Sequence, residues 1–154
     1  MRYPEAYFIS SGKGYSEHQL VAFDKALCDA RIANYNLLKV SSILPAGATQ
    51  SDEIGLREGS PLLTAYARID SNSPGDQIAT AVGVAIPCSN TNVGVIMEYS
   101  GHCTATEAEA RIKAMCAEAM ENHGISYKEI LVSSVDAIVE DGNYLSLISA
   151  VAFW

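Results

Sequence analysis

The sequence lacks most of the features that mark proteins of nucleic acids and membranes. Only 18% of its 154 residues are charged, the formal net charge is −8, and no basic cluster stands out. This argues against binding to a phosphate backbone. No apolar run is long enough to span a bilayer, and the N-terminus lacks the apolar core of a signal peptide. We therefore expect a cytoplasmic protein that binds neither nucleic acid nor a membrane.

Signatures of metal, disulfide and phosphate sites are missing as well. The four cysteines are scattered without CxxC spacing, and the three histidines lie far apart. Neither a disulfide framework nor a metal site is predicted, and the thiols are expected to be reduced. The residues around Gly12 and Gly14 lack the longer glycine frame of a phosphate-binding loop.

The chain does have enough hydrophobic residues to form the core of one packed domain. Hydrophobic residues make up 49% of it, which argues against disorder, and its length suits a single domain. Strands are expected at 7–9, ended by a turn at 10–14, and at 35–40. Residues 45–61, rich in glycine and proline, read as a surface connection without a packed face.

Further along the chain, segments 62–69, 78–86 and 93–99 are predicted to form one meander, and segments 129–139 and 144–154 a tight hairpin. Two helices are expected. The first opens at a capping box of Ser16 and Gln19 and runs to about Ala33; the second, 106–122, opens at a box of Thr104 and Glu107. The order of elements predicts an α+β fold of mainly antiparallel sheets packed face to face, with the helices outside.

The stretch from Lys39 to Pro45, Lys-Val-Ser-Ser-Ile-Leu-Pro, carries the most distinctive chemistry. In one interpretation the two serines simply close a strand before a turn set by the proline. In the other, the hydroxyl of Ser42 attacks the carbonyl of Ser41, and the chain cuts itself. Ser42 would then end as a pyruvoyl group, a ketone that can capture an amine and accept electrons, as pyridoxal phosphate does. These seven residues alone leave both interpretations open.

Two carboxylates stand in unusual surroundings. Glu98 follows an apolar strand and, on strict alternation, shares a face with Ile96. It is either a residue at the end of the strand or a proton donor whose pKa is raised by desolvation. Asp24 shares a helix face with Leu20 and Leu27. Asp24 either points into water at the edge of this face or anchors a cation in a pocket.

Four separated blocks of the sequence, in the same order, resemble the pyruvoyl-dependent arginine decarboxylase family, and the resemblance spans nearly the whole chain. The blocks are Ala22-Phe23-Asp24, Asn34 to Leu37 leading into Ser41 to Pro45, Ala81 to Pro87, and Gly94 to Tyr99 followed by Gly101. Four ordered blocks are far more specific than the serine pair, and they favour the self-cleaving interpretation.

The resemblance implies a single domain, 1–154, folded as a four-layer αββα sandwich. Self-cleavage between Ser41 and Ser42 would give a β chain, 1–41, and an α chain, 42–154, that begins with the pyruvoyl group. No metal and no pyridoxal phosphate are implied. The cleaved protomers are expected to form a homotrimer with active sites between neighbours. The implied reaction converts L-arginine to agmatine and CO2.

The resemblance also implies roles for individual residues. Ser42 becomes the electrophilic ketone, Ser41 lines the site as a new carboxyl terminus, Asn36 orients the reacting groups, and Glu98 protonates the carbon that has lost CO2. Asp24 is expected to bind the guanidinium of arginine by a charge-assisted contact. Leu20, Leu27 and Ile43 are the other residues that are expected to bind the substrate.

Three positions depart from the family pattern: Ala33 and Tyr35 stand where a glycine and a small aliphatic are expected, and Leu44 where a methionine is common. Alternatives therefore stay open at this point. The chain is either an arginine decarboxylase, a pyruvoyl decarboxylase of another amino acid such as histidine or lysine, or an unprocessed binding protein on the same fold.

Overall fold

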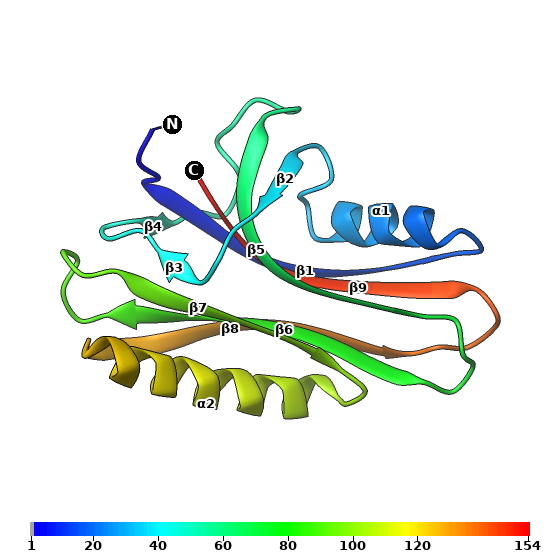
Figure 1. The fold of residues 1–154 in the computed structure, drawn as a ribbon. Coiled ribbons are helices and arrows are strands. Elements are labelled where there is room, and N and C mark those ends of the chain that lie inside the picture. Colours follow the sequence, from blue (N-terminus) through cyan, green and yellow to red (C-terminus); the bar gives the residue numbers. More distant parts are fainter. Residues whose placement is uncertain (1) are drawn as a thin grey trace.

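Two β-sheets face each other in the structure, a computed structural model that describes residues 2–154, and one helix covers the outer face of each sheet (Figure 1). Sheet A has the order β2 (Asn36–Lys39), β5 (Pro61–Ser71), β9 (Tyr144–Phe153), β1 (Ala6–Ser16) and β4 (Thr49–Gln50). Sheet B has the order β3 (Ile43–Leu44), β7 (Gly94–Gly101), β6 (Gln77–Pro87) and β8 (Tyr127–Ile138). The helices are α1 (Gln19–Asp29) and α2 (Ala105–His123).

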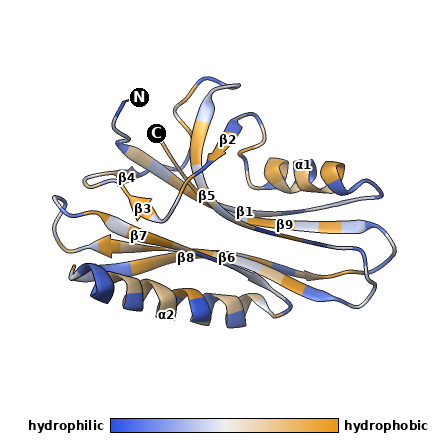
Figure 2. Ribbon diagram, in the orientation of Figure 1, coloured by the Kyte–Doolittle hydropathy of each residue, from blue (hydrophilic) through white to orange (hydrophobic). Residues whose placement is uncertain are grey.

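Most neighbouring strands are antiparallel, and only β1–β4 and β2–β5 are parallel pairs among the described residues. The predicted α+β class, with two sheets face to face and helices outside, is confirmed. Hydrophobic residues colour the strands in Figure 2, whereas hydrophilic positions colour much of α2. This is the pattern of a helix with only one face packed on a sheet.

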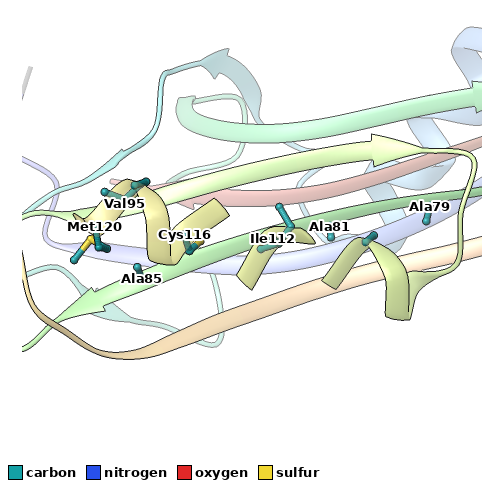
Figure 3. Packing of buried hydrophobic residues seen from close by; sticks show 9 residues of the cluster. Ala79, Ala81, Ala85, Val95, Ile112, Cys116 and Met120 are labelled. Atoms are coloured by element: carbon teal, nitrogen blue, oxygen red, sulfur yellow. The ribbon is translucent and has the colours of Figure 1, made fainter. Parts of the chain in front are cut away.

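Three apolar layers hold the sandwich together. The layer between the sheets includes Val82 and Ile96 from sheet B and Val151 from sheet A. A second layer joins α1 to sheet A. The third joins α2 to sheet B and contains Ile112, Cys116 and Met120, which lie along β6 in Figure 3.

A chain of hydroxyl groups also links the two sheets. Ser11 Oγ lies 2.7 Å from both Ser133 Oγ and Ser149 Oγ, and Ser149 Oγ lies 2.8 Å from Thr80 Oγ1. Thr80 and Ser149 are buried. Because each hydroxyl has a partner, these polar groups are accommodated in the interior without an unsatisfied donor.

Helix α2 begins and ends as its sequence predicts. Thr104 Oγ1 accepts from the backbone N–H of Glu107, and the Glu107 carboxylate accepts from the N–H of Thr104, so the capping box is present. Gly124 ends the helix with φ 65°, a left-handed conformation that favours glycine.

Helix α1 differs from its prediction at both ends. It begins at Gln19 and its N-cap is His18, whose side chain makes no capping bond. Ser16 is still part of β1, and its Oγ accepts from the N–H of His18 at 3.1 Å. The predicted capping box of Ser16 and Gln19 is therefore wrong. The helix also ends at Asp29, four residues before Ala33.

Strand β1 continues through the glycines that were predicted to end it. A Cβ at Gly12 would lie 2.3 Å from the carbonyl oxygen of Ala26, and one at Gly14 would lie 2.4 Å from that of Ala22. The two glycines thus let α1 approach β1 closely, which is one ordinary reason for glycine inside a strand. The predicted turn at 10–14 is wrong.

The predicted pairing of the later strands is right for β6 and β7, which are antiparallel neighbours, and wrong for the other pairs. β5 pairs with β2 and β9 in sheet A, whereas β6 and β7 lie in sheet B. The Ser73–Asp76 connection therefore crosses between sheets and does not close a hairpin. The same holds for Asp141 and Gly142, because β8 pairs with β6 while β9 pairs with β1 and β5.

The segment 45–61 is more structured than predicted. Thr49 and Gln50 form β4, which pairs with the start of β1. Ile54 and Leu56 pack against the apolar layer beneath α1. This segment therefore does contribute to the core.

Within residues 2–154, neither helix is both long and apolar enough to cross a membrane. All four cysteines are free: Cys28 and Cys88 are exposed, Cys103 is half-buried and Cys116 is buried.

Candidate active site

The serine pair lies where the chain passes from one sheet to the other. The N–H of Val40, after β2, donates to the carbonyl oxygen of Thr64 in sheet A at 3.2 Å. The carbonyl oxygen of Ser42, before β3, accepts from the N–H of Ile96 in sheet B at 2.7 Å. Ser41 is exposed and Ser42 is half-buried. The peptide bond between the serines is thus accessible, with the backbone anchored to a different sheet on each side.

Glu98 projects between the two sheets from β7, next to this crossing. Its neighbour on the same face, Ile96, belongs to the apolar layer between the sheets. The Oε2 atom of Glu98 is buried and has no hydrogen-bond partner among the described residues. Burial raises the pKa of Glu98, while the nearby charge of Lys39 lowers it. A carboxyl group of this kind is suited to hold a proton and release it to a reacting atom.

A cavity of about 360 Å³ opens beside Glu98. Its wall from sheet A is formed by β2 and β5 and its wall from sheet B by β7; the lining residues are Lys39, Tyr66, Ala67, Arg68, Glu98, Tyr99 and Ser100. Larger hollows occur elsewhere on the surface. None of them contains Glu98 or either serine, so their size has no bearing on chemistry at the serine pair.

Two cations stand at this cavity, and each is held by neighbouring groups. The Nζ atom of Lys39 lies 4.7 Å from the centre of the Tyr66 ring. The Arg68 guanidinium lies 3.7 Å from the centre of the Phe23 ring and donates to Asp70 at 2.7 and 3.2 Å. Hydrogen bonds from Arg68, Ser146 and Gln19, with the Arg68 charge, outweigh burial and lower the pKa of Asp70. The charge of Arg68 is therefore balanced by the Asp70 carboxylate. Lys39 is the cation that lowers the pKa of Glu98.

Asn36 lies at the other end of β2 from the serines. Its side-chain nitrogen donates to the carbonyl oxygen of Gly59 at 2.8 Å, and the residue is exposed. This is the turn-closing contact that its sequence position suggests. Within one chain, the structure shows no hydrogen bond from Asn36 to Ser41 or Ser42 among the described residues.

The expected substrate-binding residues of α1 are not part of the Glu98 cavity. Asp24 is exposed and Leu20 is 74% exposed, while Leu27 packs in the layer between α1 and sheet A. Ile43 is the exception, because it directly follows Ser42 and is 38% exposed. A single chain thus brings together the serines, Ile43 and the strand of Glu98, and it holds Asp24 and Leu20 on a separate outer face.

The departures from the family pattern lie away from Glu98. Ala33 and Tyr35 line a different cavity, and the Tyr35 hydroxyl donates to the carbonyl oxygen of Leu56 at 3.3 Å. Leu44 is buried in the layer between the sheets. In one chain, these three residues alter the surroundings of the site and not the lining of the Glu98 cavity.

Sequence reasoning missed several groups at the site. Lys39 carried a weak signal, since it lies two residues before Ser41 on a strand that leads directly to the site. Tyr66 and Arg68 gave none, because their strand, β5, was predicted to pair with β6, and it pairs with β2 and β9 in the other sheet. The N–H of Ile96 was also missed. Every residue except proline has a backbone N–H, so the sequence does not indicate which one lies at the site. The described residues contain no group of three or more His, Cys, Asp or Glu side chains placed to hold a metal ion.

Comparisons with known proteins find relatives of this chain by sequence and by fold. The family model for pyruvoyl-dependent arginine decarboxylase matches residues 6–154. A pyruvoyl-dependent arginine decarboxylase of Pyrococcus abyssi is 39% identical over 137 residues, covering 88% of this chain and 86% of the relative. The corresponding protein of Thermococcus kodakarensis is 36% identical over 151 residues, covering 97% and 96%. A solved pyruvoyl-dependent histidine decarboxylase has a TM-score of 0.54 and 16% identity, covering 67% of this chain and 54% of its own, which shows likeness of fold.

Proposed function

The chain belongs to the pyruvoyl-dependent arginine decarboxylase family, and from this premise we propose that it converts L-arginine to agmatine and CO2 with a ketone made from its own Ser42. The family implies a covalent pyruvoyl group and requires neither a metal nor pyridoxal phosphate. Such a group supplies an electrophile that captures the substrate amine and accepts the electrons of the broken bond.

The proposed cleavage falls between Ser41 and Ser42 and yields residues 1–41 and 42–154. The exposed position of Ser41 supports it, because the hydroxyl of Ser42 and the carbonyl of Ser41 lie in a connection and not inside a sheet. Attack by that hydroxyl turns the amide into an ester, as in other reactions of serine nucleophiles. The hydrogen bond from Ile96 fixes the C-terminal side of the bond.

The observation that carries the proposal is the buried, unpartnered Oε2 atom of Glu98. Buried polar atoms normally have partners, and an exception asks for a reason. A substrate held at residue 42 would supply one, since β3 pairs with β7 directly beside the site. Glu98 fits the role of the acid that delivers a proton to the carbon that has lost CO2. In this role its pKa, raised by burial, keeps it protonated at a higher pH than an exposed glutamate.

The guanidinium end of the substrate is proposed to bind Asp24, beside Leu20, Leu27 and Ile43. In one chain Asp24 lies on the outer surface and not at the Glu98 cavity. We therefore propose that neighbouring copies complete each site and that the cleaved protomers form a homotrimer. Ser41, as a new carboxyl terminus, and Asn36 are proposed to line the assembled site. The exposed thiols of Cys28 and Cys88 suit the reducing conditions of the cytoplasm, which is the proposed location.

The test is the intact mass of the purified protein together with CO2 release from labelled arginine. We expect two fragments, one ending at Ser41 and one beginning at residue 42 with the mass deficit of a pyruvoyl terminus. Borohydride in the presence of an amine should modify only the second fragment. A folded, uncut chain that binds arginine without releasing CO2 would instead identify a binding protein. Faster turnover of histidine or lysine than of arginine would correct the substrate and leave the reaction type in place.

A further inference from the structure

The hydrogen bond between Ile96 and Ser42 lies at the atom where self-cleavage must place negative charge. This inference rests on the proposed self-cleavage. Attack by the Ser42 hydroxyl first moves the acyl group of Ser41 from nitrogen to oxygen and frees the α-amino group of Ser42. The ester must then be eliminated. The α-proton of Ser42 passes to water, and the carboxylate of Ser41 leaves from the Cβ of Ser42. Water finally replaces the nitrogen, which departs as ammonia, and the ketone remains.

We propose that the backbone N–H of Ile96 is the electrophilic donor of this elimination, because it stabilises the negative charge that reaches the carbonyl oxygen of residue 42 as the α-proton is lost. The α-carbon is bonded to that carbonyl, so the electrons of its C–H bond delocalise onto the oxygen. The donor nitrogen is already 2.7 Å from it. A donor fixed in advance where charge develops is a large source of rate acceleration.

The surroundings of this donor keep it in place and away from water. Ile96 and its neighbour Val95 are each 1% exposed. Val95 pairs with Ile43 and Gly94 pairs with Leu44, so β3 holds the chain in register directly after the reacting residue. A hydrogen bond in such surroundings is stronger than one exposed to solvent.

The donor also survives the cleavage. The bond that breaks lies on the N-terminal side of residue 42, whereas the carbonyl oxygen bound by Ile96 lies on its C-terminal side, in the fragment 42–154. Ile96 therefore continues to hold the same oxygen in the mature protein. Glu98 follows two residues later on β7, and its side chain lies on the same face of the strand as that of Ile96. One strand thus supplies both the hydrogen-bond donor and the proposed acid.

The test replaces the amide of residue 96 with an ester. The α-hydroxy analogue of isoleucine, incorporated at codon 96, keeps the side chain and removes only the N–H. We expect the formation of the separate 1–41 fragment, followed under denaturing conditions, to slow by roughly 100-fold or more, the range seen when one oxyanion donor is removed. The chain should accumulate after the acyl shift, so hydroxylamine should cut the stalled protein between Ser41 and Ser42. The matched control carries the same replacement at Val95 and should cleave at close to the wild-type rate.

Two outcomes of this experiment would overturn the proposal. One is wild-type cleavage in the Ile96 ester. The other is a stalled chain that resists hydroxylamine, which would show that the N–H acts before the ester forms. A second measurement does not depend on how well the variant folds. In the mature wild-type protein, through-hydrogen-bond coupling should be detectable between the amide ¹⁵N of Ile96 and the carbonyl ¹³C of residue 42. Its absence would also overturn the proposal.

Discussion

Among the carboxyl groups whose pKa is clearly shifted, Glu98 is the one whose charge the fold disfavours. Its pKa is raised because burial disfavours the ionised form, and Lys39 offsets only part of that effect. In the unfolded chain the carboxyl group titrates near its ordinary value of 4.5. Below that value Glu98 is protonated in both states, and folding carries no cost of ionisation. As the pH rises through the raised folded value, the native state alone must bury a charge, so stability is lost.

Substituting Glu98→Gln should therefore separate stability from activity. The variant should still cleave itself, while decarboxylation falls by roughly 10²- to 10⁴-fold, the usual contribution of a general acid. In thermal unfolding it should gain stability over the wild type as the pH rises above 4.5, and the gain should vanish at lower pH. Equal decarboxylation in the two proteins would show that the proton comes from another group.

Lys39 provides a test of the electrostatics at the same site. Its charge favours the ionised form of Glu98, so Lys39→Met should raise the pKa of Glu98 further. If protonated Glu98 is the acid, the alkaline limb of the rate profile should move to higher pH. Lys113→Met, an exposed position on α2, is the matched control and should leave the profile unchanged. A shift of the limb to lower pH would contradict the assigned role.

At the scale of elements, the approach of α1 to β1 depends on Gly12. A Cβ there would lie 2.3 Å from the carbonyl oxygen of Ala26 and 2.6 Å from the nitrogen of Ala30, and both are backbone atoms that move only with the helix. We expect Gly12→Ala to lower the free energy of unfolding by about 1–3 kcal/mol, the range for overpacking. Gly142→Ala, which meets nothing within 4 Å, is the control for denaturant unfolding. Equal midpoints would show that α1 can shift without cost.

The same element shows where sequence reasoning reached its limit. Gly12 and Gly14 were interpreted as the end of a strand, because glycine breaks strands in one setting and permits close packing in another, and only the neighbouring helix decides between them. Capping of α2 was predictable since Thr104 and Glu107 bind within a single turn.

The pairing of β6 with β7 was predicted correctly, but the pairings of β5 and of β8 with β9 were not, for a related reason. Turn chemistry at Pro74-Gly75 and at Asp141-Gly142 shows that the chain reverses, but not whether it returns to the same sheet or crosses to the facing one. At the candidate site, the serine pair and Glu98 stood out in the sequence, but the residues alone left their roles open, and only the resemblance to a family favoured the catalytic interpretation. The cavity between β5 and β7 was missed because it depends on that unpredicted crossing.

At the scale of the whole molecule, the separation of Asp24 from Glu98 gives the sharpest prediction. If each site takes Asp24 from one copy and Glu98 from another, inactive Asp24→Asn and Glu98→Gln chains should restore activity when they are co-assembled. A 1:1 mixture in a closed trimer should regain about one quarter of the wild-type sites. The activity of the mixture and its mass in solution check this. No recovery in a mixed trimer would place both carboxylates in the same copy.

The position of β1 determines what the proposed self-cleavage would do to the protein. Fragment 1–41 carries β1, which lies between β9 and β4, together with α1 and β2. Its removal would strip the outer helix from sheet A and open the edge of β9. If the proposed cleavage takes place, fragment 1–41 should therefore stay bound as a noncovalent subunit and should not be discarded like a propeptide. After such a cut, refolding would require two separate chains to meet and would depend on protein concentration, so a single polypeptide would reach the native arrangement only once.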